Sequence, residues 1–74
     1  MATYAQARER VRMANALLTS PDYSPTALGT QAAQAHLSAA GILALRLGAP
    51  ERATVLRAIE RATLAARAWE TKRG

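Results

Sequence analysis

His36 is the only histidine of the 74-residue chain and the first side chain to consider for metal or proton chemistry. A zinc site needs three or four ligands, and the chain has no cysteine and no second histidine to supply them. The positions one helical turn away from His36, residues 32, 33, 39 and 40, are all alanine. We therefore expect no metal and no cofactor, and predict that His36 is a buried, hydrogen-bonded or interfacial side chain.

The serines and acidic residues do not form a recognisable catalytic set. Ser20 and Ser24 lie in a segment where turn formation and helix capping explain them, and Asp22, the only aspartate, lies in the same turn. Glu60 and Glu70 are ten positions apart, which is too far along one helix to share a substrate. No glycine-rich phosphate loop is present. The sequence therefore predicts that the protein is not an enzyme.

The chain is short, and its apolar residues are mostly small. Of its 37 apolar residues, 19 are alanine, and only Trp69, Tyr4 and Tyr23 are aromatic. A domain of this size buries only about 60–65% of its unfolded surface, and burying alanine removes little area from water. Because no disulfide can supplement the core, we expect association with a partner or with a second copy to complete it.

The net charge of +5 favours binding to nucleic acid, acidic proteins or anionic lipid but does not choose among them. Arg8, Arg10 and Arg12 follow the first residue with no apolar segment, so we expect no secretory signal. Residues 23–45 carry no charge and are numerous enough to span a bilayer, but many of them are polar or alanine. We therefore expect no membrane span and a cytoplasmic protein.

Residues 3–19 have the apolar spacing of an amphipathic helix. One face carries Tyr4, Ala7, Val11, Ala14 and Leu18. The segment TSPDYSP, residues 19–25, then interrupts the pattern with two prolines and an aspartate, which predicts a turn. Ser24 suits an N-cap with Pro25 in the first turn, so a second helix is expected over residues 25–47.

A second joint is predicted at Gly48. A glycine here suits a left-handed C-terminal cap, and Pro50 and Glu51 suit the first turn of a third helix over residues 50–72. One face of that helix carries Val55, Ile59, Ala62, Ala66 and Trp69. The short link makes the second and third helices neighbours, so we expect a single all-α domain, residues 1–74, folded as a three-helix bundle.

The expected helix over residues 25–47 is apolar over more than half of its circumference. One face carries Leu28, Ala32, Ala35, Ala39, Ile42 and Leu43, and the adjoining face carries Ala33, Leu37, Ala40, Ala44 and Leu47. We therefore place this helix at the centre of the bundle, contacted on two sides. Small residues at helical spacing let neighbouring backbones approach closely. The predicted close-packing seam consists of Ala35, His36, Ala39, Ala40 and Leu43.

The run AQAHLSAAGILAL, residues 33–45, is similar to alanine-rich stretches in short helical proteins of GC-rich actinobacteria and their phages. The likeness centres on the sequence Ala-Gln-Ala-His and spans thirteen residues. Those proteins are largely uncharacterised, so the resemblance implies an origin rather than an activity.

The segment LALRLGAPERATVLRAIERA, residues 43–62, resembles a helix-turn-helix motif, with a glycine turn and a small residue, Ala44, four positions before the glycine. The resemblance implies DNA or RNA binding through Arg52, Thr54, Arg57 and Arg61. Val55 lies one position further from the glycine than is usual in that family, and a plain antiparallel hairpin explains the segment equally well. Nucleic-acid binding is therefore the alternative function.

Several larger apolar residues fall outside the predicted core faces: Met13, Leu17, Leu45 and Leu64. In a chain with so few large side chains, their placement favours a surface for another protein or for a second copy of the chain. The function that we expect is a small helical protein-binding module, a phage or accessory regulator that acts by binding a partner protein or by homo-oligomerisation.

Overall fold

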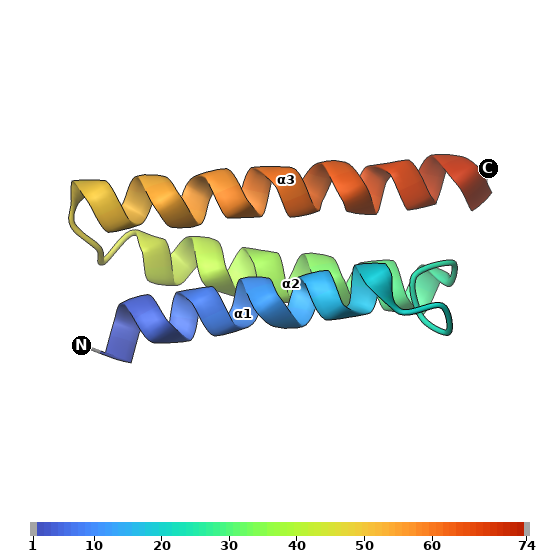
Figure 1. Ribbon diagram of the computed structural model, residues 1–74, viewed down its shortest axis with the longest axis horizontal. Coiled ribbons are helices and arrows are strands. Elements are labelled where there is room, and N and C mark those ends of the chain that lie inside the picture. The colour runs from blue at the N-terminus through green and yellow to red at the C-terminus, as the bar shows by residue number, and fades with distance from the viewer. Residues whose placement is uncertain (1, 74) are drawn as a thin grey trace.

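A computed structural model describes residues 2–73, which form three α-helices. The helices are α1 (Ala2–Thr19), α2 (Ala27–Ala44) and α3 (Ala49–Arg73). They lie side by side, with successive helices antiparallel (Figure 1), and each contacts both of the others. The described residues contain no strand. The all-α three-helix bundle predicted from the apolar periodicity is therefore confirmed.

The core follows the bundle axis in two clusters. The larger combines residues of all three helices: Val11, Ala14, Leu18, Ala33, Leu37, Ala40, Ala62 and Ala66. The smaller consists of Ala7, Ala44, Leu47 and Val55. Three larger side chains, Tyr4, Ile59 and Trp69, are partly buried against these clusters. The apolar faces predicted for the first and third helices are thus confirmed.

Alanine dominates this core. Of the twelve buried apolar side chains among the described residues, seven are alanine. Helices with small residues at their contacts can approach closely, and the body is accordingly slender, with extents of 38 × 17 × 15 Å. Seven large apolar side chains lie at the surface instead: Met13, Tyr23, Leu28, Ile42, Leu45, Leu56 and Leu64.

Helix α2 begins at Ala27, two residues later than predicted, because its N-cap is Thr26 and not Ser24. The Thr26 hydroxyl accepts a hydrogen bond from the N–H of Gly29 at 2.9 Å and donates to the carbonyl of Tyr23 at 2.7 Å. Ser24 is buried within the turn, two residues before the cap. A cap must directly precede the N–H groups that lack helical partners, and the turn places Thr26 there.

Helix α2 also ends earlier than predicted, at Ala44. Leu45 keeps helical backbone angles, φ −62° and ψ −20°. The N–H groups of residues 45–47 each donate to the carbonyl three residues before, which tightens the last turn. Leu47 then packs beside Val55 in the smaller core cluster.

The left-handed cap predicted at Gly48 does not form, since the φ of this glycine lies outside the left-handed region. Its carbonyl instead accepts a hydrogen bond from the N–H of Arg52 at 2.9 Å, which opens α3. Pro50 and Glu51 stand in the first turn of α3, as predicted. The link between α2 and α3 is therefore a tightened helical turn followed directly by a new helix.

Helix α2 contacts both other helices, so its predicted central position in the bundle is confirmed. Its contacts are made mainly through the face that carries Ala33, Leu37, Ala40 and Ala44. The second expected face is covered only in part: Leu43 packs against the smaller core cluster, whereas Leu28 and Ile42 are exposed. These two side chains lie outside because α1 and α3 also contact each other, which makes the bundle triangular in cross-section.

Candidate interaction surface

The side of α2 that faces away from the core carries large apolar side chains in solvent. Six exposed residues form this surface, which we call the α2 outer face: Leu28, Gln31, Ala35, Ser38, Ile42 and Leu45. Leu28 is 77% exposed, Ile42 64% and Leu45 74%. Isolated apolar residues are common on protein surfaces, but here three large ones share one stripe of a single helix face.

The α2 outer face has the spacing of a helix-pairing seam. Its residues fall into two series with seven-residue spacing, 28, 35 and 42, and 31, 38 and 45. Such series run along one side of a helix and form the contact stripe in paired helices. Large side chains stand towards the two ends of the stripe, and the small Ala35 and Ser38 stand at its centre. A second helix can therefore approach most closely at the middle of α2.

The α2 outer face contains no charged group, because no residue from 23 to 45 is acidic or basic apart from His36. Charges flank it from the other helices. On the α1 side, Nη1 of Arg10 lies 3.1 Å from Nδ1 of His36. On the α3 side, Nε2 of Gln34 donates to a carboxylate oxygen of Glu70 at 3.0 Å. The surface is thus an uncharged stripe with polar edges.

His36 is partly buried and forms part of the contact between α1 and α2. Because the guanidinium of Arg10 can only donate, this contact needs Nδ1 of His36 as the acceptor. Within residues 2–73, no group of three histidine, cysteine or acidic side chains lies close enough to hold a metal ion.

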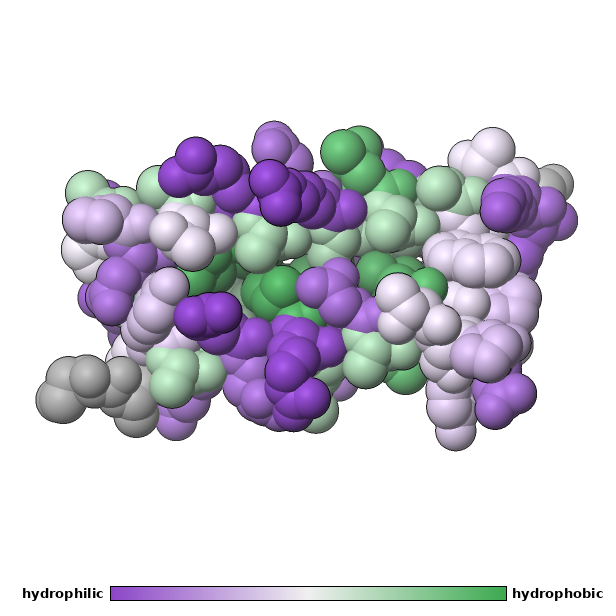
Figure 2. Space-filling model, viewed as in Figure 1, coloured by the Kyte–Doolittle hydropathy of each residue, from purple (hydrophilic) through white to green (hydrophobic). Residues whose placement is uncertain are grey.

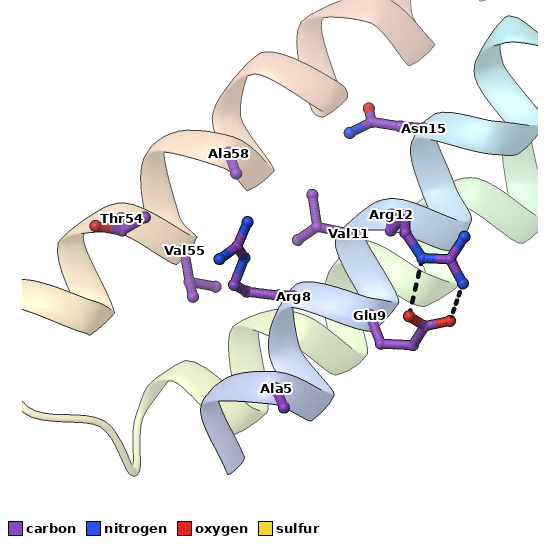
Figure 3. A pocket seen from close by; sticks show the side chains of 9 residues that line it. All are labelled: Ala5, Arg8, Glu9, Val11, Arg12, Asn15, Thr54, Val55 and Ala58. Atoms are coloured by element: carbon purple, nitrogen blue, oxygen red, sulfur yellow. Dashed lines mark hydrogen bonds and ion pairs between the residues drawn. The ribbon is translucent and has the colours of Figure 1, made fainter. Parts of the chain in front are cut away.

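A hollow between α1 and α3 is the other notable surface feature. It is an open cavity of ≈ 610 Å³, lined by Val11, Val55 and Ala58 below and by Arg8 and Arg12 at the rim (Figure 3). Figure 2 shows hydrophobic side chains along the hollow and hydrophilic side chains on both sides of it. Its chemistry differs from that of the α2 outer face because arginines border it.

An ion pair occupies one rim of this hollow. Nε of Arg12 donates to Glu9 at 2.9 Å, and a second nitrogen pairs with the other carboxylate oxygen (Figure 3). The hydrogen bond from Arg12 lowers the pKa of Glu9 below its usual value and raises the pKa of Arg12. Arg8 points into the hollow. None of the nine lining residues pairs a nucleophile with a base, so the hollow offers a cation and no catalytic set.

The four residues predicted as a protein interface do not share one surface. Leu45 belongs to the α2 outer face, whereas Leu64 is 62% exposed on the side of α3 that faces away from the core. Met13 is 38% exposed on α1, and Leu17 packs against the larger core cluster. The placement outside the core is thus confirmed for Leu45 and Leu64, while Leu17 is partly buried.

Leu28 and Ile42 were expected on a face covered by a neighbouring helix, and they are exposed instead. One feature of the sequence distinguishes their stripe from the buried one. Their stripe also contains the polar Gln31 and Ser38, whereas the buried stripe from Ala33 to Ala44 contains no polar residue. In a helix that can bury only one side, the stripe with polar members is the one left in solvent.

The predicted close-packing seam is correct at Ala40, which is fully buried between the helices. His36, Ala39 and Leu43 are partly buried. Ala35 is exposed and belongs to the α2 outer face, so its assignment to the seam was wrong. No neighbouring helix covers Ala35 because α1 and α3 both pack on the opposite side of α2.

The residues predicted to contact nucleic acid are all exposed on α3; Thr54, Arg57 and Arg61 share one helix face by their spacing, and Arg52 lies off that face. Thr54 lines the hollow between α1 and α3, and its hydroxyl donates to the carbonyl of Pro50 at 3.1 Å. The helices of a helix-turn-helix cross at about 90–120°, whereas α2 and α3 run side by side (Figure 1). Residues 43–62 therefore form the antiparallel hairpin that was the other interpretation of this segment.

Comparisons with protein-family models, with curated proteins and with solved structures find no match to the chain. None of the helices formed by residues 2–73 combines the length and the apolar character that crossing a bilayer requires.

Proposed function

We propose that the protein is a small helical module that binds another protein through the α2 outer face. The observation that carries this proposal is the exposure of Leu28, Ile42 and Leu45 on one uncharged stripe, while alanine fills most of the core. Burying such a side chain stabilises by about 1.5–3 kcal/mol. Association that covers these three side chains would therefore bury apolar surface that the single chain leaves in solvent.

The shape and chemistry of the α2 outer face favour a protein over other ligands. A small molecule needs a concave site that encloses most of its surface, and this face is the convex side of a helix. Nucleic acid needs cations against its phosphates, and the face has none. A module without a catalytic set acts on its partner by occupying or recruiting it, which fits an accessory regulator.

Nucleic-acid binding is the second candidate, and it would use a different surface. The net charge of +5 and the exposed Arg57 and Arg61, one turn apart on α3, support it. Neither arginine belongs to the α2 outer face. Substitutions on α2 and on α3 can therefore separate the two functions.

Affinity capture from nuclease-treated extract of the native host tests the proposed function, with wild type, Ile42→Glu and Leu64→Glu as matched baits. Ile42 is 64% exposed and Leu64 is 62% exposed, so the two substitutions place a glutamate at equally exposed apolar positions. We expect a protein that wild type and Leu64→Glu retain and that Ile42→Glu loses. Retention of the same proteins by all three baits, or recovery only without nuclease, would contradict the proposal.

A further inference from the structure

We propose that the partner of the α2 outer face is the same face of a second copy of this chain, packed antiparallel to the first. This inference rests on the proposed function, because it names the occupant of the same surface. The α2 stripe is self-complementary in one register, its lack of charge suits a second copy, and the side of the bundle is large enough for a dimer.

The register follows from the two seven-residue series. In an antiparallel helix pair, a member of one series faces a member of the other series across the interface. Leu28 then faces the partner's Leu45, Gln31 faces the partner's Ile42, and Ala35 faces the partner's Ser38. Each pairing occurs twice around a two-fold axis that passes between His36 and Leu37. A two-fold interface requires this kind of self-complementary stripe.

The sizes of the side chains fit this register. The central layers combine alanine with serine, so the two helices can approach closely at the middle. The outer layers combine leucine with leucine, and these side chains are 77% and 74% exposed in the single chain. A parallel register would place Gln31 against the partner's Gln31 and Ser38 against the partner's Ser38. The antiparallel register instead pairs each polar residue with an apolar or small one.

Charge also favours a second copy. Two chains of net charge +5 repel each other, and a contact through an arginine-bearing surface would bring like charges together. The α2 outer face lies within the uncharged stretch from residue 23 to 45. An acidic partner would find no cation to pair with on this face. A second copy needs none.

The available area matches what a dimer needs. Stable interfaces bury about 600 Å² or more on each partner, and one long side of a 38 × 17 × 15 Å body offers an area of this order.

Sedimentation over a wide concentration range tests dimer formation. We expect wild type and Leu64→Glu to pass from monomer to dimer with the same midpoint, and Ile42→Glu to need at least tenfold more protein. Leu28→Glu, at the other end of the stripe, should behave like Ile42→Glu. Far-ultraviolet circular dichroism checks that each variant keeps the helical fold. A wild type that stays monomeric, or a dimer that only Leu64→Glu weakens, overturns the inference.

The register can be tested by cross-linking because the chain has no cysteine. Gln31→Cys/Ile42→Cys should form inter-chain disulfides on mild oxidation, since the two positions face each other in the antiparallel dimer. Within one chain they are separated by about 16 Å along the helix. Each single variant should remain unlinked for the same reason. Self-linking of the single Gln31→Cys variant would show a parallel pair and overturn the register.

The outcomes also separate this inference from the proposed function. If wild type is monomeric while Ile42→Glu still loses a captured host protein, the face binds a different partner and only the inference fails. If wild type is monomeric and no bait differs from another, both fail. If wild type dimerises and only Ile42→Glu and Leu28→Glu weaken the dimer, the second copy is the protein partner that the proposed function requires.

Discussion

The indole nitrogen of Trp69 donates a hydrogen bond to the backbone carbonyl of Leu18 at 3.0 Å. The last carbonyls of a helix have no helical partner, and Leu18 is the penultimate residue of α1. Trp69 therefore ties the C-terminal part of α3 to the end of α1, fifty-one residues away in sequence. The ammonium of Lys72 lies 4.9 Å from the centroid of the same ring, within the range of a cation–π interaction.

Trp69→Phe is expected to destabilise the protein by about 0.5–1.5 kcal/mol, because it removes the hydrogen bond to Leu18 and keeps most of the ring. Trp69→Ala should destabilise it further, since the packing against the larger core cluster is also lost. Urea unfolding at one fixed protein concentration measures the free energy of unfolding of both variants and of wild type. Equal stability of wild type and Trp69→Phe would show that the hydrogen bond does not contribute.

Two glycines of α2 should respond to alanine in opposite directions. A Cβ on Gly29 would collide with the backbone carbonyl of Tyr23, so Gly29→Ala is expected to destabilise by about 1–3 kcal/mol. A Cβ on Gly41 meets nothing within 4 Å, and alanine favours the helix by about 0.5–1 kcal/mol. Thermal melting of Gly29→Ala, Gly41→Ala and wild type compares their melting temperatures. A lower melting temperature for Gly41→Ala as well as for Gly29→Ala would contradict the open space at Gly41.

Two alanines of α2 test which side of the helix is covered. Ala40 is fully buried, so Ala40→Leu should overpack the bundle and destabilise it by about 1–3 kcal/mol. Ala35 is exposed, so Ala35→Leu should change the stability of the single chain by no more than about 0.5 kcal/mol. Denaturant unfolding at low protein concentration compares them. A large loss from Ala35→Leu would show that α2 buries its outer face within one chain.

The pair of Glu9 and Arg12 predicts a pH dependence. Arg12 lowers the pKa of Glu9 in the folded chain, so the pair stabilises α1 above the ordinary carboxyl pKa of 4.5. That stabilisation is lost as the pH falls through the lowered pKa. Both side chains are exposed, so the effect should be small and should shrink with added salt. A double-mutant cycle with Glu9→Gln and Arg12→Gln measures the coupling free energy between the two side chains. We expect a favourable coupling at pH 7 and none at pH 2, where Glu9 is protonated.

Arginine substitutions on α3 test the nucleic-acid alternative. If Arg57 and Arg61 contact phosphates, Arg57→Gln/Arg61→Gln should flatten the salt dependence of duplex binding by up to about two units of log–log slope. Arg8→Gln/Arg46→Gln removes the same charge from α1 and from the turn after α2, and serves as the control. Equal slopes for the two double variants would indicate non-specific attraction to a +5 chain.

Sequence alone predicts the three helices well, because each has a continuous apolar stripe, a turn with two prolines separates the first two, and Pro50 marks the start of the third. The stripes of α1 and α3 place Val11 and Val55 in the core as predicted. The cap at Thr26 was harder to predict, since Ser24 has the same chemistry and only the path of the turn decides between them. The pattern of residue types does not predict the path of the backbone through this turn.

The candidate site was predictable only in part, for a geometric reason. Helix α2 carries two apolar stripes, and sequence cannot tell whether its neighbours sit on opposite sides or on one side. The contact between α1 and α3 makes the bundle triangular and leaves Leu28 and Ile42 outside. Leu45 was placed at the surface correctly because polar Gln34 and Ser38 lie on its side of the helix.

The alanine-rich interior also determines where side-chain freedom is lost. Alanine has no rotamers to give up, so closing a core in which seven of twelve buried apolar side chains are alanine costs little side-chain entropy. The side chains with several rotamers, Leu28, Ile42 and Leu45, remain free to rotate in the single chain. Each loses about 0.5–1 kcal/mol of rotamer entropy only when something covers it. For these three side chains, ordering would therefore accompany binding rather than folding.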